Sequence, residues 1–508
     1  MIKIREFHYF LHDLKGGHYL YPQPFFVYLM IIIMENSNNF SENISEIKVD
    51  NPKKGSVPLK LSLGFAIGEI PDMIAYQGFS FLIFTFYSVV IKLDITKITI
   101  VYIIWSIINA FNDPVLGALS DKTRTKKFTG GRRRPWIVSM ILPLPLIMIF
   151  LFTPIQTTPI VTAIYMAIIM ILFDTFYTTY SLNHTSLYPE MFQTDKAREE
   201  VGFMRRTIMI VGLLIAFVLP GIVIDDLVGT DQTTKIQYII CGAVFGLLIF
   251  IFMLIHLKYG IKEPDLEELH QRKTFSLIES IKHTLTNKDF LLIVFCSTMN
   301  WYVFGIIPMI LPIYASANFN LEQGAFETSL LLIVAFLSSV PGVFFWSKID
   351  GKVGSRKAFM FSHLLWIISF IPLLFIQSYT LCLINMIFIG FGLGGAPYFL
   401  DRNISNIVDQ DELFTKQRRE ASYYGVHAIF IRLSGILQIL SINIVFSYNG
   451  WEQVTLVDPT ADQKLGLRLL MSIFPAVALL IGLFFLWKFP LNKQRVKENQ
   501  EKRKKLDL

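Results

Sequence analysis

Long apolar stretches recur through almost the whole chain of 508 residues. A helix needs about 20 apolar residues to cross the hydrocarbon core of a bilayer, and about twelve stretches of this sequence are that long. Nothing of comparable size is left to fold as a soluble domain. The pattern predicts an all-α membrane protein with about twelve transmembrane helices, whose centres lie near Phe81, Ile108, Leu146, Ala167, Ile215, Phe245, Val303, Phe336, Ile368, Phe388, Leu437 and Leu479.

The balance of apolar and charged residues supports a membrane environment. Hydrophobic residues make up 53% of the chain and charged residues 17%, which is too apolar for a protein of this length to cover with polar surface. The sequence contains no P-loop, HExxH or GxSxG motif and no clustered metal-ligand spacing. We therefore expect neither an enzyme nor a bound cofactor. The cysteines, Cys241, Cys296 and Cys382, all fall inside apolar stretches and predict no disulfide.

Basic residues are concentrated in every second loop between the apolar stretches. These loops cover residues 122–134, 196–206, 258–288, 348–357, 402–419 and 493–505, whereas the intervening loops contain few Lys or Arg residues. By the positive-inside rule, this alternation predicts a protein that crosses the cell membrane many times and has both termini in the cytoplasm. The formal net charge of +7 is thereby explained without nucleic acid as a partner.

Residues 1–57 form an N-terminal lead-in that differs from the rest of the chain. An apolar run with two prolines, HYLYPQPFFVYLMIIIM, precedes a polar stretch typical of a disordered segment. We interpret Met34 as the true start, so that residues 1–33 would be absent from the mature protein; an interfacial helix is the alternative. Mass spectrometry of the intact N-terminus would decide, because peptides from residues before Met34 would contradict this interpretation.

A weak internal repeat divides the chain into two halves. GALSDKTRTKKFTGGRRRPW follows the second apolar stretch and FFWSKIDGKVGSRKAF follows the eighth; both place Asp at a helix end, then glycine, then basic residues. Paired membrane repeats of this kind form transporters with a site at their interface. We expect a six-helix bundle over residues 58–258, a cytoplasmic loop over 259–288, a second six-helix bundle over 289–490 and a basic cytoplasmic tail over 491–508.

Two polar residues in the second apolar stretch have the chemistry of a cation site. Asn109 and Asp113 are four residues apart and share one helix face. An ionisable group within a membrane span is costly and usually faces a cavity or a partner, and carboxylate and amide oxygens suit a hard cation such as sodium. In the alternative interpretation, Asp113 only caps the junction between helix and loop, and Asp121 pairs with the basic loop.

Three stretches resemble a known family of transporters. They are NDPVLGALSDKTRT with the following GRRRPW, YTTYSLNHTSLYPEMFQTDKAREE, and DRNISNIVDQDELFTKQRREASYYGVHAIFIRLSG. In order and spacing they are similar to the glycoside-pentoside-hexuronide:cation symporters, the melibiose permease-like family of the major facilitator superfamily. The resemblance implies the major facilitator fold, alternating access between two bundles, and coupling of solute transport to Na⁺ or H⁺.

The resemblance also implies a coupling-cation site at Asn109, Asp113 and Thr178. Sugar-transporting relatives have Asp where this chain has Asn109, so one negative ligand is missing. This difference leaves sodium coupling, proton coupling and uncoupled transport open.

The substrate site that the resemblance implies is also altered. Asp72 lies near the position of the family's substrate-binding Asp, whereas Ser181 replaces another Asp of the sugar symporters. Asp174 lies on the same helical stripe as Thr178 and Ser181, so the carboxylate could have moved two turns along that face. Paired carboxylates accept hydrogen bonds from sugar hydroxyls. The alternative is a substrate that is not a sugar.

Two cations complete the expected substrate site. Arg206 enters the fifth span, and Arg432 lies in the eleventh span, where relatives commonly have Lys. Either could balance a buried Asp. Because guanidinium binds phosphate or carboxylate through two parallel bonds, Arg432 favours an anionic substrate group, with a structural ion pair as the alternative. His184 and His427 lie in the family motifs and are candidates for pH dependence.

The basic loops predict a cytoplasmic gate formed by Asp121, Arg132, Arg133, Arg134, Asp350 and Arg356. The functional prediction is cation-coupled symport of a small solute, most simply a sugar or glycoside, by a monomer. A symporter of lysophospholipids or other anionic headgroups is the alternative within transport. A membrane sensor that does not transport is the alternative of another class.

Overall fold

The protein is described by a computed structural model that covers residues 57–123, 131–263, 284–319, 321, 324–415, 419–451, 454, 456 and 459–505. Residues 1–56, including the expected start at Met34, and most of the expected central loop lie outside the described residues. The side chain of Asp121, one of the expected gate residues, also lies outside them.

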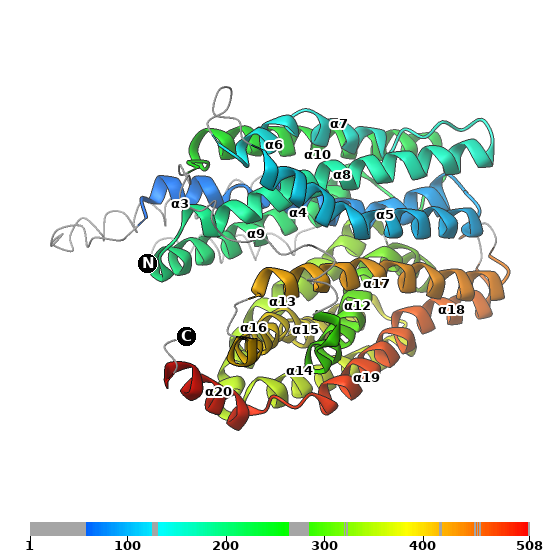
Figure 1. The fold of residues 1–508 in the computed structure, drawn as a ribbon. Helices are drawn as coiled ribbons and strands as arrows, with labels where there is room; N and C mark the ends of the chain where they lie inside the picture. Colours follow the sequence, from blue (N-terminus) through cyan, green and yellow to red (C-terminus); the bar gives the residue numbers. More distant parts are fainter. Residues whose placement is uncertain are drawn as a thin grey trace, which may run out of the picture. The chain divides into compact units, whose positions relative to one another are not determined.

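The first half of the described chain forms a helical bundle, coloured blue to green in Figure 1. Its first membrane segment consists of two helices and a terminal π-helix, and its third segment is also divided in two. The elements are α3 (Leu59–Ala66), α4 (Glu69–Thr85), a π-helix (Phe86–Val90), α5 (Ile95–Lys122), α6 (Arg134–Ser139), α7 (Pro143–Phe150), α8 (Pro159–Met191), α9 (Asp195–Val223) and α10 (Gln232–Tyr259).

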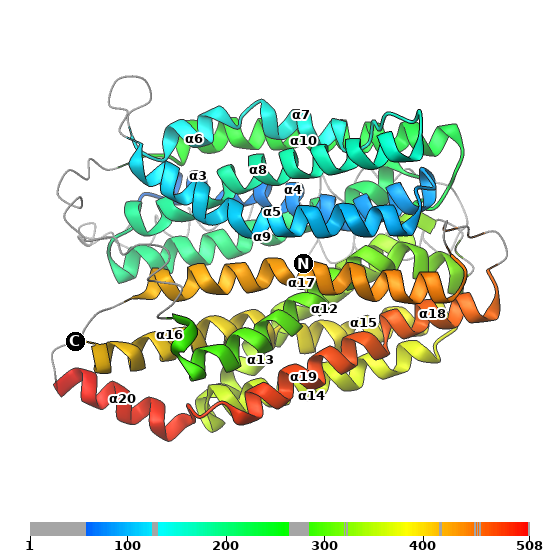
Figure 2. The same cartoon turned by 45° about the vertical axis from the view of Figure 1, so that its right-hand side comes forward.

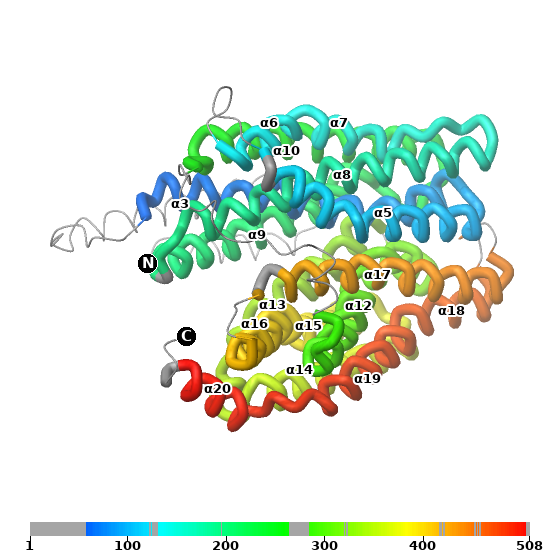
Figure 3. Tube along the Cα trace, in the orientation of Figure 1, coloured from blue at the N-terminus to red at the C-terminus, as the bar shows by residue number. Residues whose placement is uncertain are grey.

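The second half forms another helical bundle, coloured green to red, and the tube in Figure 3 follows both along the chain. Its elements are α12 (Lys288–Asn318), α13 (Gly324–Val353), α14 (Ser355–Phe370) with a 3₁₀ turn (Ile371–Leu374), α15 (Tyr379–Leu393), α16 (Gly395–Thr415), α17 (Glu420–Tyr448), α18 (Ala461–Met471), α19 (Ile473–Lys488) and α20 (Lys493–Lys505). The prediction of an all-α membrane protein built from two bundles is confirmed.

Eleven segments of the described chain are long and apolar enough to cross a membrane, and a shorter apolar segment, Arg134–Phe150, corresponds to the expected third span. Each predicted centre falls inside one of these segments. Helix α5 illustrates how an apolar pattern indicates a membrane helix: its exposed large side chains recur at helical spacing on one face. This face suits contact with lipid tails and contains Ile100, Ile104, Ile107, Phe111 and Val115.

Capping residues and prolines determine where individual helices begin and break. Asp94 accepts hydrogen bonds from the backbone N–H groups of Thr96 and Lys97 at the start of α5, and Thr158 caps α8 in the same way. Pro143 stands at the start of α7, where its missing N–H costs nothing, so the third segment divides at this point.

The two bundles pack against each other through three pairs of helices: α5 with α17, α4 with α12, and α9 with α13. Figure 2 shows α5 running beside α17. At the end of the bundles remote from Val57, aromatic rings meet across the interface. Phe217 stacks on Phe336 with centroids 5.2 Å apart, and Phe84 lies 6.3 Å from Phe446. Apolar contacts therefore hold the bundles together at that end.

The basic tail forms a helix that packs on the second bundle. Arg503 of α20 forms ion pairs of 2.8 Å with both Asp409 and Glu412 of α16. Lys493 donates hydrogen bonds of 2.9 Å and 3.0 Å to the carbonyls of Gly351 and Lys352 at the end of α13. These contacts cap exposed carbonyl groups and anchor α20, so the tail is part of the fold.

Candidate transport site between the bundles

An ion pair between α5 and α17 joins residues that are 319 positions apart in the sequence. The Arg432 guanidinium approaches both carboxylate oxygens of Asp113, with Nη2 3.3 Å from Oδ1 and 3.2 Å from Oδ2. The two side chains are 18% and 22% exposed. Among the residues that the structure describes, no other ion pair links the two bundles.

A second carboxylate approaches the same guanidinium from α8. Asp174 accepts a hydrogen bond of 2.7 Å from the Asn112 amide, which also donates to Thr175 at 3.3 Å. Asp174 is 1% exposed and acts electrostatically on Arg432 together with Asp113. The structure thus brings together three of the residues that the sequence singled out, whereas Asn112 was missed because an amide beside Asp113 carries no distinct sequence signal.

Aromatic hydroxyls connect this group to Asp72. Tyr76 and Tyr177 both lie near Arg432, and their rings stack with centroids 5.3 Å apart. Tyr177 and Ser181, four residues apart on α8, also lie beside the Asp72 carboxylate. Asp72, Asp174 and Ser181 therefore lie along one continuous polar stripe with the ion pair.

Several buried oxygens of this region have no hydrogen-bond partner in the described structure. They include Asp72 Oδ1, Asn109 Oδ1 and Thr178 Oγ1, whose residues are 8%, 2% and 2% exposed. An unsatisfied buried oxygen is costly, and these atoms can act as ligands for a cation or accept from a solute hydroxyl. The oxygens of Asp113 are instead engaged by Arg432. The described residues contain no group of three or more His, Cys, Asp or Glu arranged to hold a metal ion.

A small cavity lies between α4, α5, α12 and α17, next to the ion pair. Its wall combines aromatic side chains with polar ones. Its lining includes Tyr76, Phe79, Tyr102, Trp105, Asn109, Trp301, Phe304, Arg432 and Gln438. Apolar and aromatic walls with convergent polar groups are the usual form of a small-molecule site.

Arg206 lies apart from this cavity. It is exposed on α9 and acts electrostatically on Asp401 of α16, across the interface. Its neighbour Arg205 instead turns into the first bundle and donates to the Glu69 carboxylate. Of the two cations expected in the substrate site, the structure brings only Arg432 to the central carboxylates.

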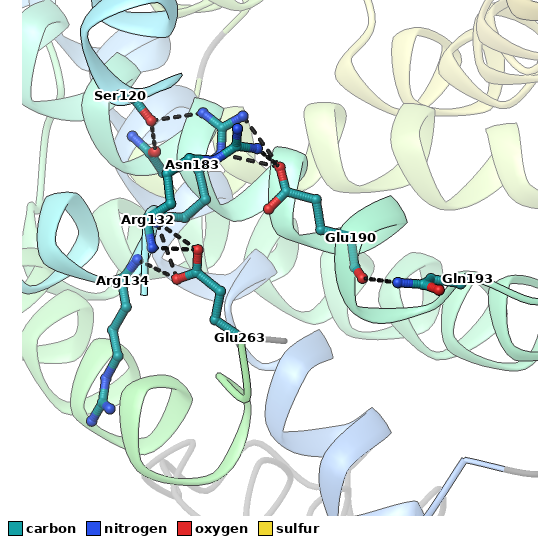
Figure 4. A network of polar contacts seen from close by, with 8 residues as sticks. Ser120, Arg132, Arg134, Asn183, Glu190, Gln193 and Glu263 are labelled. Atoms are coloured by element: carbon teal, nitrogen blue, oxygen red, sulfur yellow. Dashed lines mark hydrogen bonds and ion pairs between the residues drawn. The ribbon is translucent and has the colours of Figure 1, made fainter. Parts of the chain in front are cut away.

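Two of the expected gate residues of the first half, Arg132 and Arg133, form ion pairs within their own bundle (Figure 4). Glu190 Oε1, at the end of α8, pairs with Arg132 at 2.6 Å and with Arg133 at 3.3 Å. Arg133 also donates to Ser120 at 2.6 Å. Residue Glu263, which sequence reasoning missed, accepts from the backbone N–H groups of three consecutive arginines. Its carboxylate binds the segment before α6 to the end of the first bundle.

The expected gate residues of the second half also pair inside their bundle. Asp350 forms an ion pair of 2.8 Å with Arg402 and accepts a hydrogen bond of 3.0 Å from Tyr398. Arg356 donates to the carbonyl of Trp487. Asp350 and Arg356 therefore have different partners, both on helices that the sequence could not place beside them.

The Glu263 contact leads to a prediction about the 131–134 segment. Replacing Glu263 with Gln removes the charge from hydrogen bonds to the amides of Arg132, Arg133 and Arg134. A charge-assisted bond contributes about 1.5–3 kcal/mol, so we expect hydrogen exchange of these amides to accelerate about tenfold. Glu199→Gln, at an exposed position of α9, is the control and should leave these amides unchanged. Unchanged exchange in Glu263→Gln would contradict the contact.

The chain is similar to known transporters along most of its length. The family model for MFS/sugar transport proteins matches residues 64–493. The sodium-dependent lysophosphatidylcholine symporter 1-A of Danio rerio is 20% identical over 471 residues, covering 86% of each chain. A putative 2,3-dihydroxypropane-1-sulfonate exporter of Escherichia coli is 23% identical and covers 91% of this chain and 100% of its own.

The fold is also similar to a solved structure. The crystal structure of nucleoside transporter NupG superimposes with a TM-score of 0.60 at 16% identity, over 85% of this chain and 99% of that chain. The matching family and the curated relatives are transport proteins, and the expectation that the protein is not an enzyme is confirmed. Two helical bundles, a central ion pair and a family match over most of the length agree: the chain belongs to the MFS/sugar transport protein family and is a multi-span membrane transporter.

Proposed function

We propose that this protein is a secondary active symporter that couples a cation to the movement of a small polar solute by alternating access. The observation that carries the proposal is the charge balance of the site: the carboxylates of Asp113 and Asp174 both face the guanidinium of Arg432. Two carboxylates and one guanidinium leave a deficit of positive charge in a buried place. Because uncompensated buried charge is costly, a bound cation would stabilise this state.

The proposed cation site uses the three residues expected from the sequence, two of which have oxygens without a partner. Asn109 and Thr178 offer buried oxygens that lack partners, and Asp113 would supply the carboxylate once Arg432 releases it. When a cation binds Asp113, it replaces Arg432 as the partner of this carboxylate. Because Arg432 is on α17, cation binding is thereby coupled to the position of α17. The coupling is reciprocal, because each ligand must raise the affinity for the other by the same factor.

A sugar or glycoside is the first proposed substrate class. Asp72 and Asp174 can accept hydrogen bonds from several hydroxyl groups, and the aromatic wall that includes Trp105 and Trp301 offers flat apolar surfaces to the opposite side of a sugar ring. The family match to sugar transport proteins supports the same class.

A lysophospholipid or another solute with an anionic headgroup is the second proposed class. Arg432 can bind a phosphate or sulfonate through two parallel bonds, and it lines the cavity beside the aromatic wall. A relative named as a lysophosphatidylcholine symporter and another named as a sulfonate exporter are consistent with this class.

The proposed topology places both ends of the described chain in the cytoplasm, in keeping with the basic loops at that end. The proposed unit is a monomer located in the cell membrane, because the Asp113–Arg432 pair and the cavity are formed within one chain.

Uptake into proteoliposomes tests the proposal. The panel contains labelled disaccharides, lysophosphatidylcholine and a short hydroxysulfonate, each with an imposed sodium or proton gradient. We expect one class to accumulate with a gradient, and Asp113→Asn to lose that stimulation by about 5- to 150-fold, the range of typical coupling energies. Exchange of solute at equal concentrations should persist in the variant.

The panel distinguishes the two substrate classes from each other and transport from a sensor function. Disaccharide accumulation would support the first class, and accumulation of the lipid or sulfonate would support the second. Gradient-independent uptake would contradict symport. Absence of uptake, together with binding of a panel member to the purified protein, would favour a sensor.

A further inference from the structure

A chain of buried hydrogen bonds lies inside the first bundle and is not used by the transport site described above. Glu69 Oε1 lies 3.1 Å from His184 Nε2, and His184 Nδ1 lies 3.2 Å from His256 Nε2. The chain ends where His256 Nδ1 lies 3.1 Å from the carbonyl oxygen of Gly64. The three side chains are 6%, 1% and 0% exposed. The chain connects α3, α4, α8 and α10.

Counting hydrogens shows what this arrangement requires. The carbonyl of Gly64 can only accept, so His256 must hold a hydrogen on Nδ1. Each of the other two contacts needs one hydrogen between its atoms, which makes three hydrogens for the chain. Two neutral imidazole rings supply only two. The hydrogen-bonded chain therefore holds one proton more than two neutral histidines and a carboxylate provide.

Arg205 indicates where the additional proton resides. Its Nε also donates to Oε1 of Glu69, the same oxygen that faces His184. A guanidinium that donates to a carboxylate favours its ionised form. The additional proton is then on the imidazole side, shared between His184 and His256, and the Glu69 carboxylate balances its charge.

We propose that His184 and His256, with Glu69 as counter-charge, form a binding site for one transferable proton, and that this proton is a second coupling cation, in addition to the cation proposed at Asp113. The second clause rests on the proposed function. The site takes up one proton when the chain is complete and returns one proton when a hydrogen bond of the chain opens. Its groups are separate from Asn109, Asp113 and Thr178.

The charged groups around the site provide a link to the cavity. With the proton, the site and Arg205 carry one net positive charge, which faces the carboxylate of Asp72 one turn along α4. Loss of the proton removes that charge and leaves Asp72 less compensated. Asp72 also lies beside Tyr177, which neighbours Arg432. The other titratable groups near the site are Tyr180 and Tyr188 of α8, which contact His184 and Arg205.

The main chain is shaped to admit both rings. The first span breaks between α3 and α4, and Gly68 stands in the break. A Cβ at Gly68 would come within 2.6 Å of His184 Cε1 and 2.8 Å of His256 Cε1. Tyr180 donates to the carbonyl of Gly68 at 2.9 Å. The histidine rings therefore lie directly against the break between α3 and α4.

Nitrogen NMR on ¹⁵N-histidine-labelled protein in nanodiscs tests the site without a substrate, because imidazolium and neutral tautomers have different ¹⁵N shifts. We expect an imidazolium signal at neutral pH that disappears in both His184→Gln and His256→Gln. His363→Gln is the matched control and should retain the signal. His363 is equally buried, but it faces the acceptor Phe359 and the donor Asn300, which a neutral ring satisfies. Absence of a signal that depends on both His184 and His256 overturns the site.

Transport tests the role of the proton. With a panel member that the wild type accumulates, proton-driven accumulation should fall by about 5- to 150-fold in His184→Gln and His256→Gln. Equilibrium exchange should persist, and His363→Gln should behave as the wild type. The coupling role is overturned if proton-driven accumulation is unchanged in both variants. It is also overturned if a sodium gradient alone drives accumulation in the wild type. Absence of any uptake by the wild type counts against the proposed function, while the NMR signal still decides the site.

Discussion

Replacing Arg432 with Gln should abolish gradient-driven uptake and lower the stability of the protein. The change leaves the Asp113 carboxylate buried without its bidentate partner, with Asp174 close by. Removing one member of a buried ion pair costs about 3–5 kcal/mol. Because both side chains are about one-fifth exposed, we expect the lower end, about 3 kcal/mol. Thermal unfolding of the purified variant and proteoliposome uptake measure the two effects.

Two further variants make the result specific. The double variant Asp113→Asn with Arg432→Gln removes both charges, so it should recover most of the stability but no gradient-driven uptake. Arg402→Gln breaks the Asp350 pair at a side chain that is 52% exposed, and exposed pairs contribute about 1 kcal/mol or less. It should retain uptake. Wild-type uptake by Arg432→Gln would remove this ion pair from the mechanism.

Replacing Gly221 with Leu should drive the bundles apart at the end remote from Val57. A Cβ at Gly221 would lie 2.8 Å from the Cα atom of Phe326 on the opposing helix α13 and 3.0 Å from Ser329 Oγ. Such overpacking costs about 1–3 kcal/mol. Because the contact exists only when this end is closed, the same energy should move the population toward the opposite-facing state by about 5- to 150-fold.

Spin-label distances measure this shift. Labels at Gln232→Cys and Asp462→Cys report on the remote end from exposed positions of the two bundles, and the native cysteines are buried. We expect a longer distance to become populated in Gly221→Leu. Gly425→Leu is the control, because nothing lies within 4 Å of a Cβ at that position. An unchanged distance distribution would mean that the Gly221 contact does not hold the remote end closed.

Sequence reasoning succeeded where the relevant physics is local. A run of apolar residues long enough to span a bilayer needs no partner to be recognised, so each of the segments was located from the sequence. A carboxylate in such a run is unfavourable without compensation, so Asp113 stood out as a functional candidate by itself, whereas Asp174 and Arg432 became candidates through the family resemblance. The family resemblance came from motif order, and the match over residues 64–493 confirms it.

Partnerships between helices could not be read in the same way. Arg206 was expected at the site and Arg205 was not, although they are adjacent, because only the packing of α9 decides which side chain turns inward. Asp350 meets Arg402 for the same reason. The choice of partner depends on how helices far apart in sequence are placed.

The sequence alone determined the membrane environment, the number of spans, the family and the presence of buried charge, because these depend on composition and periodicity along one segment. The tertiary structure decided which charges compensate one another, from Asp113 with Arg432 to the shared proton we infer between His184 and His256. Two buried charges compensate each other only when they lie within a few ångströms. Those contacts exist only after six helices from each half have packed.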